Sequence, residues 1–195
     1  MNMKKILIFI GCIIFTSNII SQTQKASLIF LDGDVLEGYG VITKDNKIKF
    51  RISLDEKPDV WDNLIVRGII FYGFEKEEEY EYIYTKIKKE PELLRVVLKG
   101  KITLYERKRF FKVYRLNNLN GEDFGNSFLG VRENIDLFIK RDNEEIATLY
   151  NRTMKRSIQN YFKDCDAIFD LIESNEYRKY SREKLVKNYN IFCGD

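Results

Sequence analysis

Apolar and polar residues alternate along much of the first two thirds of the chain. Between Lys47 and Leu54 the apolar residues Ile48, Phe50, Ile52 and Leu54 alternate strictly with charged or polar ones. Successive side chains of a strand point to opposite faces, so this period of two places all four apolar side chains on one face of a sheet. The segment is predicted to be a strand with one buried face.

Further strands are expected on both sides of this segment. The runs Ser27 to Leu31 and Val35 to Thr43 flank Asp32-Gly33-Asp34, and Lys44-Asp45-Asn46 follows the second run, which predicts two hairpin turns. The later strands are expected at Leu64 to Phe74, Glu79 to Ile87, Leu93 to Leu98, Lys101 to Glu106 and Phe110 to Leu116. A long loop is expected from Asn117 to Ser127. After it, Phe128 to Arg141 is expected to fold into a hairpin around Glu133-Asn134.

The period changes after Asp142, where apolar residues recur at helical spacing. Ser181 is expected to cap a second helix. The apolar stripe of the first helix holds Tyr161, Phe162, Cys165, Ile168, Phe169 and Ile172, and that of the second holds Leu185, Val186, Tyr189, Phe192 and Cys193. Two stripes joined by a short connection predict an antiparallel helical hairpin.

These patterns predict an α+β fold. Residues 1–21 are expected to be a signal peptide, residues 22–141 an antiparallel β meander, and residues 142–195 a C-terminal helical region. Short, regular strand spacing is typical of a meander that forms a curled sheet, a barrel or a sandwich.

The first 21 residues have the layout of a signal peptide. Lys4 and Lys5 precede the apolar run Ile6 to Phe15, and polar residues follow near Ser21. Two alternatives remain open, namely a retained N-terminal anchor and a lipoprotein whose lipid is attached to Cys12. The chain is therefore expected to be periplasmic, displayed on the cell surface or secreted, and to meet a membrane only if the leader is retained or Cys12 is lipidated.

The net charge of the chain argues against nucleic acid as a partner. The formal net charge is +3, and it falls to +1 once Lys4 and Lys5 leave with the leader. Binding to nucleic acid needs a concentrated excess of Lys and Arg, so no nucleic-acid partner is expected.

Cys165 and Cys193 are the cysteines that remain after cleavage of the leader. They lie near the start of the first expected helix and at the end of the second, which an antiparallel hairpin brings together. In an oxidising compartment the pair is expected to form a disulfide that contributes about 3 kcal/mol to stability. The alternative is two independent buried thiols.

The sequence singles out no catalytic, cofactor or metal site. It contains no His, which removes a serine triad of the usual form and the common zinc sites. Asp32, Asp34 and Glu37 lie close together, but the other ligands of a calcium loop are missing, which favours a hairpin turn. Acidic residues are numerous enough for a hydrolase, yet no two are distinguished as a catalytic pair.

Five residues are candidates for binding. Lys101, Tyr105, Arg107 and Arg109 lie in the most basic stretch of the chain, where aromatic residues are interleaved. Such a stretch either binds an anionic glycan or lipid headgroup, or forms the outer face of paired strands whose aromatic side chains point inward. Trp61, in the expected loop from Asp55 to Asn63, either contacts a sugar or protein or packs over the rim of the sheet.

Three parts of the chain carry a resemblance. They are Leu31 to Gly38, Glu92 to Tyr105, and the two cysteine segments Tyr161 to Cys165 and Lys187 to Cys193. Together they resemble a group of uncharacterised exported envelope proteins of Bacteroidetes-type bacteria, which show a G-D-x-x-x-G turn, a phrase like L-x-x-G-x-x-x-L-Y and paired cysteines in a helical tail. The resemblance implies a periplasmic or surface protein and carries over no catalytic residue.

The expected function is that of a non-enzymatic envelope module that binds a protein or a glycan, without a cofactor. The alternative is a hydrolase that uses acidic residues on a periplasmic or extracellular glycan. That alternative requires two carboxylates to converge in one cleft, with a raised pKa on one of them.

Overall fold

The computed structural model describes residues 23–73, 76–85, 87–115, 127–149, 159, 161–174, 176 and 181–194. The chain divides into two compact units, unit 1 (residues 1–77) and unit 2 (residues 78–195), and each is considered by itself. The expected signal peptide with Cys12, and the expected loop up to residue 126, lie outside the described residues.

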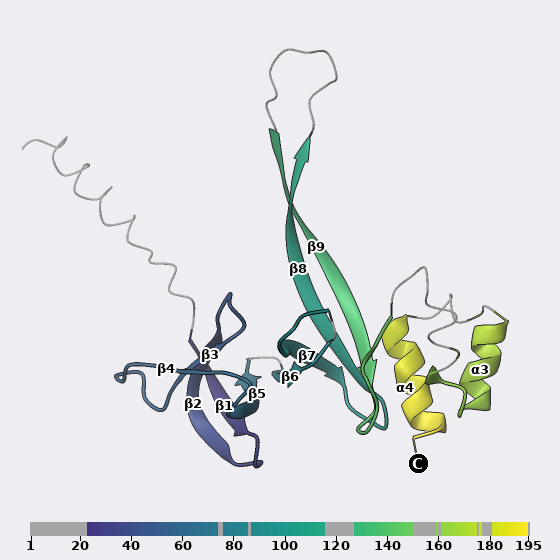
Figure 1. Cartoon of the computed structure of the whole chain (residues 1–195), viewed down its shortest axis with the longest axis horizontal. Helices are drawn as coiled ribbons and strands as arrows, with labels where there is room; N and C mark the ends of the chain where they lie inside the picture. The colour runs from purple at the N-terminus through teal and green to yellow at the C-terminus, as the bar shows by residue number, and fades with distance from the viewer. Residues whose placement is uncertain are drawn as a thin grey trace, which may run out of the picture. The chain divides into compact units, whose positions relative to one another are not determined.

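Unit 1 is an antiparallel sheet of five strands (Figure 1). Both predicted hairpin turns are confirmed, because β1 pairs with β2 across Asp32-Gly33-Asp34 and β2 pairs with β3 across Lys44-Asp45-Asn46. The strands are β1 (Gln24–Phe30), β2 (Val35–Ile42), β3 (Ile48–Arg51), β4 (Asp59–Trp61) and β5 (Val66–Tyr72), in the spatial order β5-β1-β2-β3-β4.

The strict alternation from Lys47 to Leu54 predicts four buried apolar side chains, and only two of them are buried. Ile48 and Phe50 are buried in the core of unit 1, but Ile52 and Leu54 are exposed. The reason is that β3 ends at Arg51, whose guanidinium donates to the carbonyl oxygen of Leu54 and holds the following turn. Without a continued strand, the period of two no longer directs the later side chains inward.

Unit 2 contains the other five strands, and two of them are much longer than expected. The strands are β6 (Glu77–Ile83), β7 (Glu92–Leu98), β8 (Thr103–Arg115), β9 (Ser127–Lys140) and β10 (Ala147–Thr148), in the order β10-β9-β8-β7-β6. β8 joins into one strand the two that were predicted. The predicted hairpin around Glu133-Asn134 is wrong, since these residues pair with Phe110 and Arg109 in a continuous β8–β9 ladder.

After the strands, the described part of the chain contains two helices, α3 (Asp166–Glu173) and α4 (Arg182–Phe192). Ser181 caps α4 as predicted, because its hydroxyl accepts from the backbone N–H of Lys184 at 3.2 Å. α3 begins later than expected, since Cys165 is extended and serves as the N-cap. The stripe prediction fails for Phe192, which is exposed at the end of α4.

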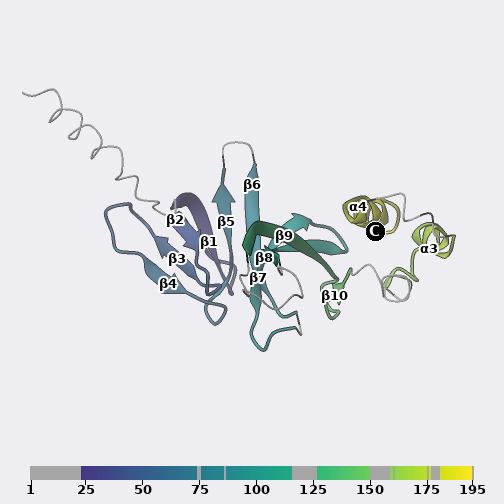
Figure 2. The same cartoon turned by 90° about the horizontal axis from the view of Figure 1, so that it is seen from above.

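The helices pack on the same unit's sheet, and α4 lies between α3 and the strands in both views (Figures 1 and 2). Ile102 and Leu104 share a core with Ile168, Leu185 and Tyr189. Asn190 adds polar contacts, because its side chain accepts from the backbone N–H of Ile102 at 2.9 Å and donates to its carbonyl oxygen at 2.8 Å. The amide group therefore pairs with Ile102 much as a neighbouring strand does.

The predicted α+β class is confirmed, with antiparallel strands followed by two C-terminal helices. Every strand pair with a described register is antiparallel. Within each unit the strand order is open, with different strands at its two ends, rather than strongly curled or closed into a barrel.

Candidate functional site

A buried cluster of charged side chains ties three strands of unit 2 together. Arg107 of β8 donates to Glu92 of β7 at 2.6 Å and to Asp136 of β9 at 2.9 and 3.1 Å. Arg109 donates to the other oxygen of Asp136 at 2.7 Å. Asp136 is 2% exposed and Glu92 is 5% exposed, so the cluster is largely shielded from water.

Each carboxylate in this cluster is held by more than one donor. Glu92 also accepts from the Thr85 hydroxyl at 3.2 Å and pairs with Lys88 at 2.7 Å. A buried charge is tolerated when it is paired and fully hydrogen-bonded, and losing one partner is then costly. The cluster therefore fixes β7, β8 and β9 relative to one another.

Beyond this cluster β8 and β9 continue as a two-stranded ribbon. Figure 1 shows them running on together past the end of β7, and the β8–β9 ladder extends to Arg115 and Ser127. We call residues 108–113 of β8 and 130–135 of β9 the distal ribbon. Among the described strands, the β7–β8 ladder ends at the pair Arg95 and Glu106, so along the distal ribbon β8 and β9 pair only with each other.

The distal ribbon exposes apolar side chains on both of its faces. Phe110 is 67% exposed and lies opposite Glu133, whereas Phe111 is 45% exposed and lies opposite Arg132. Since successive residues of a strand alternate between faces, the two rings point in opposite directions. Val131 and Ile135 are also exposed, on the face of Phe110.

The same ribbon is basic. Its four basic side chains, against one acidic side chain, give a net charge of +3. Glu133, the acidic one, pairs with Lys108 at 3.2 Å, and Arg109 lies over the Phe111 ring at 5.3 Å. Lys112 and Arg132 are both exposed.

Two of the candidate residues from the sequence come together at the base of this ribbon. Arg107 and Arg109 both bind Asp136. Tyr105 is close to them in sequence but is only 4% exposed, and its hydroxyl donates to Glu81 at 2.9 Å. Burial, together with the negative charge of Glu81, raises the pKa of Tyr105. Tyr105 thus belongs to the core.

The other two candidates lie in different surroundings. Lys101 donates to the carbonyl oxygen of Cys193 at 2.7 Å and so holds the end of α4. Trp61 forms the end of β4 in unit 1 rather than part of a loop, and its ring meets Phe30 edge-on at 5.5 Å between centroids. Its indole nitrogen is buried and has no hydrogen-bond partner among the described residues.

Sequence reasoning missed the acidic half of the charged cluster and the exposure of the aromatic residues. The interpretation that the aromatics of the basic stretch point inward holds for Tyr105 and is wrong for Phe110 and Phe111. The period of two among Ile135, Leu137 and Ile139 was the available signal that a strand continues after Asn134. Glu92 and Asp136 carry no local signal, since their partners lie on other strands.

The helical part of unit 2 has its own polar cluster. Arg141 donates to Asp164 at 2.7 Å and to the Tyr189 hydroxyl at 2.9 Å, and Tyr189 donates to Asp164 at 2.7 Å. Burial raises the pKa of Tyr189 to about 12. Burial alone would also raise the pKa of Asp164, but the hydrogen bond from Tyr189 and the charge of Arg141 outweigh it and lower that pKa.

The predicted disulfide is confirmed. Cys165 and Cys193 are bonded, with their Cα atoms 5.8 Å apart. The bond joins the N-cap of α3 to the C-cap of α4. It therefore closes the helical pair at the end where Lys101 also binds.

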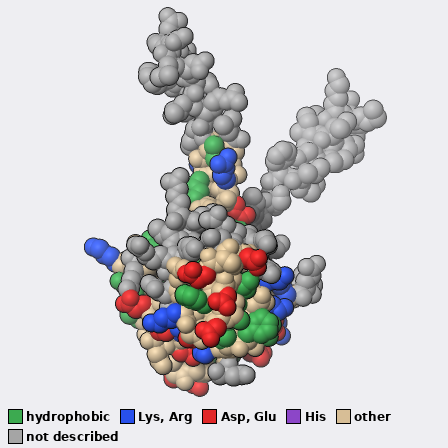
Figure 3. Space-filling model, turned by 90° about the vertical axis from the view of Figure 1, so that its right-hand side faces the viewer, with side chains coloured by type: hydrophobic (Ala, Val, Ile, Leu, Met, Phe, Trp, Pro, Cys, Tyr) green, Lys and Arg blue, Asp and Glu red, His purple; other side chains and the backbone are tan. Residues whose placement is uncertain are grey.

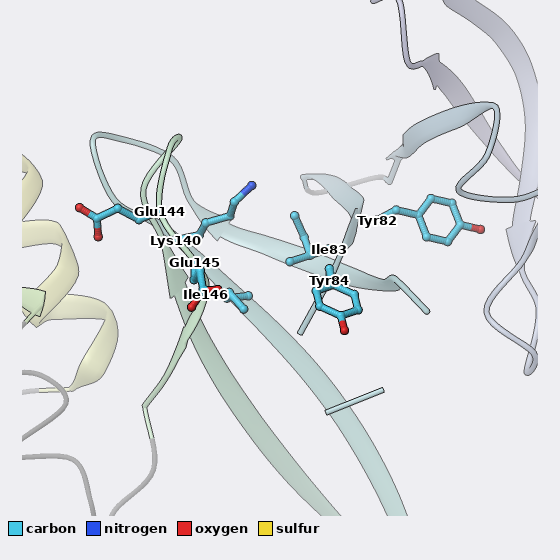
Figure 4. Close-up of a pocket in the computed structure, with 7 residues that line it drawn as sticks. All are labelled: Tyr82, Ile83, Tyr84, Lys140, Glu144, Glu145 and Ile146. Carbon is cyan, nitrogen blue, oxygen red and sulfur yellow. The ribbon is translucent and has the colours of Figure 1, made fainter. Parts of the chain in front are cut away.

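A pocket of about 250 Å³ lies where β6, β9 and the segment after β9 meet. Ile83, Lys140 and Ile146 help to line it, while the Glu144 and Tyr82 side chains point away in opposite directions (Figure 4). Glu144 is bound to Arg141 at 3.1 Å. Glu145 is the other carboxylate in the lining, and since the Glu144 side chain points away, the two do not converge as glycoside hydrolysis needs.

Figure 3 views the molecule from the side on which the two helices lie, and acidic side chains are spread across the middle of that face. Asp166, Asp170 and Glu173 of α3 are exposed, as expected for the polar face of an amphipathic helix. Among the described residues, no group of three or more His, Cys, Asp or Glu side chains is placed to hold a metal ion.

Neither described helix has the length and apolar character that crossing a membrane requires. Comparison with family models, with curated proteins and with solved structures finds no match for the chain.

Proposed function

We propose that the protein is an exported, non-enzymatic binding module of the cell envelope, which contacts its partner through the distal ribbon. The observation that carries this proposal is the exposure of Phe110 and Phe111 among four basic side chains. Exposed apolar side chains that gather within one surface, rather than occurring singly, mark interaction sites. Aromatic and Arg side chains are also the residues most often found at the centre of interfaces.

Export is part of the proposal. It is supported by the signal-peptide pattern of residues 1–21 and by the Cys165–Cys193 bond, because disulfides form and persist in oxidising compartments. The periplasm, the cell surface and the external medium all satisfy this condition. The resemblance to exported envelope proteins points the same way.

A role without catalysis is supported by the partners of the buried carboxylates. Glu92 and Asp136 are each bound by basic side chains, and this arrangement suits a rigid scaffold. A binding module needs such a scaffold, since rigid presentation of the contact residues lowers the entropic cost of binding.

The test measures binding of the purified, oxidised protein to isolated cell envelopes by sedimentation. The double variant F110S/F111S is expected to lose at least about tenfold in affinity, because burying each ring on binding contributes about 1.5 to 3 kcal/mol. L64S is the matched control, since Leu64 is an exposed apolar residue of unit 1. Equal binding by wild type and F110S/F111S would show that the ribbon is not the contact surface.

A further inference from the structure

We propose that the distal ribbon binds an anionic lipid surface, with its aromatic rings in the headgroup layer and its basic side chains at the lipid phosphates. This inference rests on the proposed function, because it names the partner class of the same surface. Three features of the ribbon support it, namely apolar side chains on both faces, basic side chains on both faces, and a rigid base.

The apolar side chains require a partner that reaches both faces. Phe110 and Ile135 are exposed on one face of the ribbon, and Phe111 is exposed on the other. A flat protein surface covers one face of a two-stranded ribbon and leaves the opposite ring in water. A lipid interface surrounds a ribbon that enters it, so the rings on both faces leave water together.

Basic side chains accompany the aromatic rings on both faces. Lys112 lies on the face of Phe110, and Arg132 lies directly opposite Phe111 on the other strand. Long basic side chains can lay their methylene groups along apolar surface while their charged ends reach the lipid phosphates. Anionic lipids attract each such charge, so a surface with a net charge of +3 favours them over neutral lipids.

The charged cluster holds the base of the ribbon rigid before any partner binds. Arg107 binds Glu92 and Asp136 across three strands, and Asp136 also binds Arg109, the first residue on the Phe111 face. A two-stranded ribbon on its own is at best marginally stable in water. The charged cluster supplies the missing support, so the ribbon does not have to order itself when it binds.

The experiment uses the full, oxidised protein and two kinds of vesicle. One is pure phosphatidylcholine, and the other contains equal parts of phosphatidylcholine and phosphatidylglycerol. Wild type is expected to sediment with the phosphatidylglycerol vesicles at least about tenfold better than with the neutral ones. Added salt should weaken this binding, because it screens exposed charges.

Variants separate the aromatic from the electrostatic contribution. F110S/F111S and K112E/R132E are each expected to lose at least about tenfold in vesicle affinity, whereas L64S should bind like wild type. Phe110, Lys112 and Arg132 are exposed, so these changes should leave the fold intact, and unchanged thermal unfolding checks this. If none of the four ribbon substitutions lowers the affinity for vesicles, the proposal is wrong.

The same variants distinguish failure of this inference from failure of the proposed function. If wild type binds neither kind of vesicle but F110S/F111S binds envelopes more weakly than wild type does, the partner is an acidic protein or glycan and the lipid proposal is wrong. If F110S/F111S binds envelopes like wild type, the proposed function itself fails. Retained binding to envelopes from which the lipids have been extracted would also contradict a lipid partner.

Discussion

Asp136 is the most deeply buried side chain of the charged cluster. It accepts hydrogen bonds from both Arg107 and Arg109. Removing one member of a buried ion pair is costly because the remaining charge stays buried without its partner. The structural importance of this residue therefore far exceeds that of the many exposed acids.

The variant Asp136→Asn is expected to lower the free energy of unfolding by about 3 kcal/mol. The loss should lie at the low end of the range for buried pairs, because Arg107 keeps Glu92 and Arg109 is partly exposed. Urea denaturation of the oxidised protein measures it. Glu133→Gln, on the same strand, removes an exposed pair with Lys108 and should cost less than about 1 kcal/mol. Equal losses in the two variants would show that burial of the cluster has no energetic consequence.

At this scale the sequence identifies residue types better than their surroundings. Arg107 and Arg109 stand out in a basic stretch, but their shared partner Asp136 is 29 and 27 residues away. Charge and aromatic content also do not reveal which side of a strand faces water. Phe110 and Phe111 became candidates for binding only when the ladder put them past the end of β7.

At the scale of elements, alternation located the strands well and their ends poorly. β1, β2 and β7 begin and end within a few residues of the prediction, because each has turn residues on both sides. β8 and β9 were each divided in two, since Glu133-Asn134 looks like a turn and Arg107 to Arg109 interrupts the apolar pattern. Both segments remain extended because each supplies the other's hydrogen-bond partners, which no local window contains.

The attachment of α4 depends on a carboxylate, so it should depend on pH. The folded protein lowers the pKa of Asp164 below the ordinary value of 3.8. A carboxyl group with a lowered folded pKa stabilises the protein above the unfolded pKa, and this contribution is lost as the pH falls through the folded pKa. Acid should therefore loosen the contact among Asp164, Arg141 and Tyr189.

The variant Asp164→Asn tests this dependence by chemical denaturation at several pH values. It should be less stable than wild type by up to about 1 kcal/mol near neutral pH, because the carboxylate is partly exposed. The difference should begin to shrink as the pH falls below 3.8 and disappear once the pH is below the lowered pKa of folded Asp164. Asp170→Asn is the control, since the Asp170 side chain is exposed and makes no hydrogen bond or ion pair with another described residue. A constant difference at every pH would contradict the assignment to Asp164.

For the molecule as a whole, the disulfide places a covalent constraint in unit 2 alone. Cys165 and Cys193 are 28 residues apart, and both lie among the helices. The sequence could predict this bond because the two helical stripes are readable from local pattern and place both cysteines at one end of the helical pair. It could not predict that the chain divides at residues 77 and 78, because strands continue across that point without a linker composition.

Removing the disulfide should therefore weaken one unit and leave the other unchanged. The double variant C165A/C193A is expected to lose about 3 to 4 kcal/mol, because a loop of this length restricts the unfolded chain by about that much. Hydrogen exchange should show faster exchange in α3 and α4, while the amides of β1 to β5 keep the protection they have in wild type. Wild type treated with a reductant should reproduce this pattern, which excludes an effect of the alanines themselves. Equal loss of protection in both units would instead mean that they unfold as one cooperative body, so that the constraint on the helices stabilises the entire chain.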